Sequence, residues 1–110
     1  MSDFTLINEL TELSAKLDEA VRLMARYGRE YAQAEHDYKV QLSQTALRLR
    51  ADDMPVTLID KVIYGFKDVA DKRLKRDIAE VMYASSKENI NKLKLQMRII
   101  DGQVDREYRG

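Results

Sequence analysis

The single histidine of this sequence is the first candidate for chemistry. His36 stands between Glu35 and Asp37, and an imidazole beside carboxylates could act as an acid or base or bind a metal ion. Adjacent residues of a helix point in different directions, however, and the chain has no Glu-x-x-His pair that could build a metal site in a helical bundle. We therefore interpret His36 as solvated or interfacial and predict neither enzyme activity nor a cofactor or metal. A metal- or ligand-binding bundle is the third and weakest alternative.

Positive charge is the second candidate for chemistry. A basic cluster lies on both sides of the middle of the chain and would be gathered if the chain folds back on itself: Arg48, Arg50, Lys67, Lys72, Arg73, Lys75 and Arg76. Such a cluster could bind the phosphates of nucleic acid. Asp68, Asp71 and Asp77 interleave with it, which favours a solvated, salt-bridged face, and no aromatic residues alternate with the bases for stacking on single strands. DNA binding is therefore the alternative function.

Four tyrosines fall on one level of the chain's predicted helical seam: Tyr27, Tyr31, Tyr38 and Tyr83. We interpret them as packing residues whose hydroxyl groups reach the edge of the seam, as amphipathic side chains commonly do. The alternative is a binding notch for a peptide or a small ligand.

Bulk composition limits the classes of function. Basic and acidic residues number 19 each, so the net charge is zero, and no global field attracts nucleic acid or an anionic membrane. The 110 residues include no cysteine, which leaves one domain without disulfides. The first residues lack a basic segment followed by an apolar run, and no window approaches the ~20 apolar residues that cross a bilayer. We expect no secretory signal and a cytoplasmic location.

Hydrophobic periodicity gives the fold class. Two stretches alternate three- and four-residue steps between core-type residues, the pattern of coiled-coil packing. Because the two stripes are separated by a break, we predict an all-α fold, a long antiparallel helical hairpin. The stripes are Leu6, Leu10, Leu13, Leu17, Ala20, Met24, Tyr27, Tyr31, Ala34 and Tyr38, followed by Ala79, Tyr83, Ser86, Ile90, Leu93, Met97, Ile100 and Val104.

Breaker residues set the predicted element bounds. Pro55 ends the first helix, because proline lacks a donor and disfavours helix in the residue before it. Thr57 with Asp60 resembles a capping box that would start a short helix, and Gly65 would end that helix in the left-handed conformation. A single domain, 1–110, would then contain a helix 4–51, a turn 52–57, a short helix 58–64 and a helix 67–108.

The alignment of the two stripes is not fixed by periodicity, because heptad stripes also fit when one is shifted by a heptad. We predict the register that opposes bulky residues to small ones: Leu13 opposite Val104, Tyr31 opposite Ser86, Ala34 opposite Tyr83, and Tyr38 opposite Ala79. A shift of one heptad would instead oppose Tyr27 and Tyr83. Gly28 interrupts the first helix, and we expect it to permit close approach of another helix.

Further apolar residues lie beside the main seam and make it wider than a two-helix contact requires. The short helix could cover part of this excess. We predict that the rest mediates self-association into a homodimer, an elongated four-helix bundle. The candidate self-association residues are Val21, Leu42, Leu49, Ile78, Val81, Leu95 and Ile99.

Several strings of the chain resemble small uncharacterised helical proteins of phages and prophages of Gram-positive bacteria. They are Tyr27 to Glu35, Pro55 to Ile59, Arg76 to Glu80, Lys92 to Gln96 and Arg106 to Tyr108. The resemblance implies an accessory role in phage DNA recombination or replication within the host cell. It supplies no active-site or binding residues. Our prediction is thus a non-enzymatic protein that acts through helix-mediated contacts with a phage or host protein.

Overall fold

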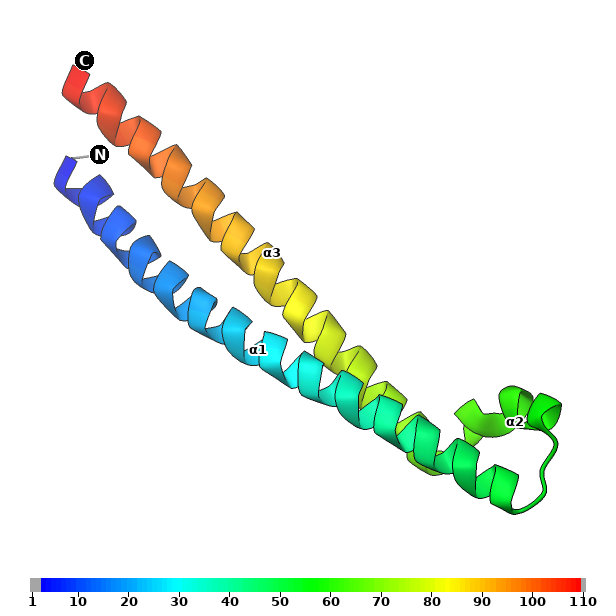
Figure 1. Cartoon of the computed structure of the whole chain (residues 1–110). Coiled ribbons are helices and arrows are strands. Elements are labelled where there is room, and N and C mark those ends of the chain that lie inside the picture. Colours follow the sequence, from blue (N-terminus) through cyan, green and yellow to red (C-terminus); the bar gives the residue numbers. More distant parts are fainter. Residues whose placement is uncertain (1–2, 110) are drawn as a thin grey trace. The chain divides into compact units, whose positions relative to one another are not determined.

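The computed structural model describes residues 3–109, apart from the side chain of Asp3, and every secondary-structure element in this range is a helix. This range contains no strand, so the predicted fold class is confirmed. In chain order the elements are α1 (Asp3–Ala51), α2 (Val56–Val62), the 3₁₀ turn η1 (Ile63–Gly65) and α3 (Lys67–Arg109) (Figure 1). The chain divides into two compact units, unit 1 (Met1–Arg26 with Ala84–Gly110) and unit 2 (Tyr27–Tyr83).

Unit 1 consists of the first part of α1 and the last part of α3, which lie side by side in opposite directions (Figure 1). Its buried cluster is made by Ala20, Ile90 and Leu93. Partly buried apolar residues of α1 pack against this cluster: Leu13, Leu17 and Met24. The predicted stripes are confirmed, because every residue in them is buried or half-buried.

Unit 2 adds α2 and η1 to the two long helices. In this unit α1 continues past the start of α3, and α2 folds back beside the end of α1 (Figure 1). Ile59 and Ile63 from this short segment enter a buried cluster with Tyr38, Leu49 and Val69. The segment thus joins Val69 of α3 in the cluster that encloses Leu49 in the last turns of α1.

The end of α1 is a Schellman motif built on an aspartate. The Met54 N–H donates to the Leu49 carbonyl at 3.0 Å, and the Asp53 N–H donates to the Arg50 carbonyl at 3.0 Å. Asp53 has a φ of 64°, the left-handed conformation that this motif requires. The prediction that Gly65 adopts this conformation is wrong, because no glycine of the described residues has a positive φ.

The start of α2 also differs from the predicted capping box. The helix begins at Val56, and its N-cap is Pro55, with φ −60° and ψ 142° and no side-chain cap hydrogen bond. The Pro55 carbonyl accepts from the N–H groups of Leu58 and Ile59, both at 3.0 Å. Proline's fixed φ suits the residue at a helix entrance, so the main chain starts the helix without the hydroxyl of Thr57. Pro55 lies outside the helix, as predicted.

The register between α1 and α3 was predicted wrongly. The Tyr83 ring lies over Gly28, where an added Cβ would be 3.2 Å from its Cε1 atom, and its centroid is 6.1 Å from that of Tyr31. Tyr83 therefore meets α1 near Tyr27, one heptad from the predicted position at Ala34. In unit 1, Leu13 likewise lies by Gln96 and Ile100 rather than by Val104. Gly28 does permit close approach, as expected, and the approaching group is the ring of Tyr83.

Candidate interaction site

Arg76 is the most constrained member of the predicted basic cluster, all of which falls in unit 2. Its Nη1 donates to Oε2 of Glu35 at 3.2 Å, its Nε donates to Oδ1 of Asp77 at 2.8 Å, and its guanidinium lies 4.6 Å from the centroid of the Tyr38 ring. The bonds to Asp77 and then Glu35 raise the pKa of Arg76 against the opposing effect of desolvation. Arg76 thus clamps α3 to α1, and its charge is already balanced.

Three other bases are held near the turn between the long helices. The guanidinium of Arg48 lies 5.9 Å from the centroid of Phe66, and that of Arg73 lies 5.2 Å from the centroid of Tyr64. Arg50 donates from Nη1 to a main-chain carbonyl of the turn at 3.1 Å. Each of the three charges is thus held by a different local partner.

The three lysines differ in their pairing. Lys67 donates to Oδ2 of Asp71 at 2.6 Å, and this bond raises the pKa of Lys67. Within the described residues, no carboxylate lies within 4.0 Å of the Nζ atoms of Lys72 or Lys75. The charge of Lys72 contributes to lowering the pKa of Asp37. Only these two lysines of the cluster therefore remain without a partner at ion-pair distance in this part of the chain.

The exposed apolar residues of α3 form the clearest candidate site. Five aliphatic residues among them are more than half exposed, between 54% and 63%, although aliphatic side chains are ordinarily buried. Four belong to the predicted self-association set, and the fifth, Leu74, is one of the further apolar residues beside the seam and stands one helical turn before Ile78. We call this set the outer stripe: Leu74, Ile78, Val81, Leu95 and Ile99.

The other predicted self-association residues lie on α1 and have different surroundings. Val21 is exposed. Leu49 is 5% exposed within the core of unit 2, and Leu42 packs against the same cluster. The short segment that contains Ile59 and Ile63 belongs to this cluster too. Leu42 and Leu49 are thus engaged inside the chain, as the alternative role of the short helix anticipated.

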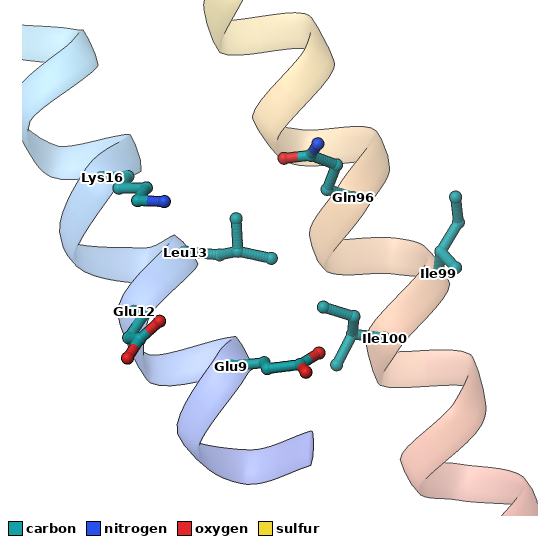
Figure 2. Close-up of a pocket in the computed structure, with 7 residues that line it drawn as sticks. All are labelled: Glu9, Glu12, Leu13, Lys16, Gln96, Ile99 and Ile100. Atoms are coloured by element: carbon teal, nitrogen blue, oxygen red, sulfur yellow. The ribbon is translucent and has the colours of Figure 1, made fainter. Parts of the chain in front are cut away.

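A groove runs beside the seam of unit 1. It has a volume of about 370 Å³. Figure 2 shows Leu13 and Ile100 pointing toward one another across it, with the carboxylate of Glu9 reaching toward Ile100 and with Ile99 on the outer side of α3. One wall is therefore mainly polar and comes from α1, while the other is mainly aliphatic and comes from α3. The lining residues are Glu9, Glu12, Leu13, Lys16, Gln96, Ile99 and Ile100.

Unit 2 has a groove of the same design, with a volume of about 430 Å³. Its α1 wall is again mostly polar, and its α3 wall again carries an isoleucine of the outer stripe. A smaller adjoining groove includes Leu74. The main groove is lined by Glu30, Gln33, Ala34, Asp37, Lys75, Ile78, Ala79 and Met82.

The two grooves occupy equivalent heptad positions. Each lining residue of the groove in unit 1 has a counterpart that lines the groove in unit 2. The counterpart lies three heptads later along α1 or three heptads earlier along α3. Glu9 corresponds in this way to Glu30, and Ile99 corresponds to Ile78. Such a repeat requires the same register in both units. A groove with one polar and one aliphatic wall suits an amphipathic helix.

His36 lies on the exposed side of α1. Its Nδ1 is 3.2 Å from Oδ1 of Asp37, which also accepts from Nε2 of Gln33 at 2.9 Å. These two hydrogen bonds, that of Gln33 first, lower the pKa of Asp37. Among the residues that the structure describes, no group of three histidine, cysteine or acidic side chains is arranged to hold a metal ion.

No family model, curated protein or solved structure matched this chain. In residues 3–109, no helix combines the length and the apolar character needed to span a bilayer. Fold and surface together define an all-α protein whose long helix α3 carries an exposed apolar stripe beside two equivalent grooves. The likeness to phage and prophage proteins stays a prediction from the sequence.

Proposed function

We propose that this chain is a non-enzymatic phage or prophage protein that acts in the host cytoplasm by binding a partner helix on the outer stripe. The observation that carries the binding role is the exposure of five aliphatic side chains at heptad spacing on α3. The phage setting, with an accessory role in DNA recombination or replication, rests on the sequence strings from Tyr27 to Glu35 and from Pro55 to Ile59.

Burial of the outer stripe provides the driving force for binding. Covering apolar surface is worth roughly 25 cal/mol per Å², and the outer stripe offers two exposed aliphatic segments, one on each side of a polar middle. The grooves beside Ile78 and Ile99 give an incoming side chain a place to enter. A helix that docks there would rest between the polar wall of α1 and the aliphatic wall of α3.

Site-specific photo-crosslinking tests this proposal. A photoreactive amino acid at position 78 or 99 should link the chain to a discrete protein in phage-infected or lysogenic cells, because both positions lie on the outer stripe. Positions 80 and 94 are matched controls, since Glu80 and Lys94 are exposed on α3 outside the stripe. Equal labelling from all four positions, or none from 78 and 99, would contradict the proposal.

The DNA-binding alternative has weaker support from the geometry. Arg76 and Lys67 already have carboxylate partners, and Arg48, Arg50 and Arg73 are held by ring or main-chain contacts. Lys72 and Lys75 are therefore the main basis for phosphate contacts. The alternative predicts a mobility shift of duplex DNA that weakens steeply with salt and disappears in the Lys72→Glu/Lys75→Glu variant. A shift that survives this double charge reversal, or no shift at low salt, would exclude that cluster.

A further inference from the structure

We infer that the helix bound by the outer stripe is α3 of a second copy of this chain, packed antiparallel. In this arrangement Leu74 meets Ile99 of the second copy, and Ile78 meets Leu95 of the second copy. The inference rests on the proposed function, since it takes the outer stripe as an interaction surface, and it adds the identity and direction of the partner.

The outer stripe has a pattern that a copy of itself can match. Between Val81 and Leu95 the same heptad positions of α3 hold Ser85, Glu88 and Lys92, all exposed. The surface is therefore apolar, then polar, then apolar. A uniformly apolar partner helix would remove Glu88 and Lys92 from water without a polar partner, which is costly. A second α3 places polar residues against this middle segment and aliphatic residues against both ends.

Charge selects the antiparallel direction. Two parallel copies in register would place Glu88 against Glu88 and Lys92 against Lys92, and such like-charge contacts are destabilising. In the antiparallel arrangement Glu88 faces Ser85 of the second copy, and Lys92 faces Val81, where its methylene groups can cover the valine. The symmetric antiparallel pairing therefore brings no two like charges together along the stripe.

The residues that flank the stripe also favour the antiparallel direction. On one side, Asp77 comes beside Arg98 of the second copy, and twofold symmetry makes this contact twice. Both side chains are available, because that of Asp77 is 52% exposed and Arg98 is exposed. On the other side, Lys75 comes beside Gln96. Opposite charges at flanking positions are the usual determinants of partner and direction in coiled coils.

The size of the contact indicates a reversible dimer. Five aliphatic side chains from each copy, all about half exposed, bury on the order of 800–1,000 Å² when they cover one another, which is near the lower limit for a specific complex. We therefore expect a dissociation constant in the micromolar range, about 1–100 μM. The dimer would be a four-helix assembly in which each copy contributes α1 and α3.

Disulfide trapping tests the register directly, because the chain has no cysteine of its own. A mixture of the Ile78→Cys and Leu95→Cys variants should form a mixed disulfide under mild oxidation, while each variant alone stays monomeric on a non-reducing gel. Glu80→Cys mixed with Lys94→Cys is the matched control and should not link. A disulfide dimer of Ile78→Cys alone would show another direction or register and would overturn the inference.

Charge exchange tests the flank without relying on oxidation. In sedimentation experiments, Asp77→Arg and Arg98→Asp should each weaken dimerisation about tenfold, and mixing the two variants should restore it, because both flanking contacts become attractive in the mixed dimer. Circular dichroism checks that helicity is retained, since Asp77 also pairs with Arg76. A mixture no tighter than its parents would contradict the inference.

The two proposals can fail separately. If the unmodified chain stays monomeric up to about 1 mM, the second copy is excluded as the partner. Photo-crosslinks from positions 78 and 99 to a different protein would then uphold the outer stripe as a binding surface. An absence of both dimer and crosslinks would reject the proposed function itself.

Discussion

Unit 1 closes its seam with two helices, whereas unit 2 adds the short segment of α2 and η1 to the same pair. The buried cluster of unit 1 is Ala20, Ile90 and Leu93. The buried cluster of unit 2 is larger and includes the ring of Tyr38 together with Leu49, Ile59, Ile63 and Val69.

The difference shows how much a third element changes a helical seam. A helix that faces one neighbour leaves the flanks of many seam residues in water. Leu13, Leu17 and Met24 are accordingly only partly buried, whereas Leu6 is fully buried. In unit 2 the short segment covers such a flank, so Leu49 is only 5% exposed. We expect local stability to be concentrated in unit 2, with slower amide hydrogen exchange around Leu49 than around Leu17.

The largest expected effect comes from removing one buried isoleucine from each unit. Ile63 in unit 2 and Ile90 in unit 1 are 5% and 6% exposed, so the two truncations remove equal area. Ile63→Ala should destabilise by about 3–4 kcal/mol, because a cavity among several elements cannot collapse or fill with water easily. Ile90→Ala should cost about 2 kcal/mol, since a two-helix seam can close or hydrate.

Urea denaturation of both variants, followed by circular dichroism, measures this difference. Amide hydrogen exchange would show in which unit each variant loses stability. Equal losses for the two variants, or a larger loss for Ile90→Ala, would contradict the view that the third element makes the tighter core.

An ion pair in each unit provides the next comparison. Arg76 and Glu35 join α3 to α1 in unit 2, with side chains 20% and 33% exposed, whereas Arg22 and Glu19 lie within one turn of α1 in unit 1 and are mostly exposed. A double-mutant cycle with alanine should give a coupling of about 1 kcal/mol for the first pair and about 0.3 kcal/mol for the second.

Thermal unfolding of the single and double variants at low salt measures both couplings. Because Arg76 also lies over Tyr38, the Arg76→Lys variant separates the planar stacking from the charge. A coupling for Arg22 and Glu19 as large as that for Arg76 and Glu35 would show that the contact between helices adds nothing.

Glycine replacement should distinguish the units by packing. An added methyl group at Gly102, in unit 1, meets no heavy atom within 4 Å, so Gly102→Ala should stabilise by about 0.5–1 kcal/mol through helix propensity. At Gly28, in unit 2, the methyl would lie 3.2 Å from the Tyr83 ring. The free-energy cost of displacing this ring should cancel the gain in helix propensity. Melting temperatures decide: equal gains at both positions would mean that the ring moves away freely.

The smallest expected effect is on the stability of the fold in acid, and it arises from a carboxylate in unit 2. Hydrogen bonds from Gln33 and His36 lower the pKa of Asp37 in the folded chain. A lowered pKa means that the stabilisation is present at neutral pH and is lost as the pH falls below about 4. Asp37→Asn should therefore flatten the acid side of the stability profile, measured as melting temperature between about pH 2 and pH 6. Gln33→Ala should flatten it in the same direction, and an unchanged profile in both variants would contradict the assignment.

The sequence predicted most of the element bounds because they depend on local signals. The two long helices end within one residue of the predicted positions, and α2 begins two residues before the predicted Leu58. The apolar stripes were also correct. The special conformations were missed, because Asp53 rather than a glycine takes the left-handed position, and the main chain of Pro55 rather than Thr57 starts the helix.

The candidate site was predicted less completely, because exposure and pairing depend on the neighbouring elements. The residues of the outer stripe could be chosen from their spacing, but the burial of Leu49 depends on where the short helix packs. The basic cluster was identified by composition, whereas the partner of Arg76 on the other long helix, Glu35, follows from the register. Charge balance at the turn could not be inferred from the order of residues alone.

The sequence by itself determined that this chain is two long helices with a short one between them, and which face of each long helix is apolar. Those features arise from periodicity, proline and helix propensity, which act over a few residues. Only the tertiary structure decided the register, because a shift by one heptad still opposes apolar residues to apolar residues. The choice depends on a contact distant in sequence, the ring of Tyr83 in the space left by Gly28.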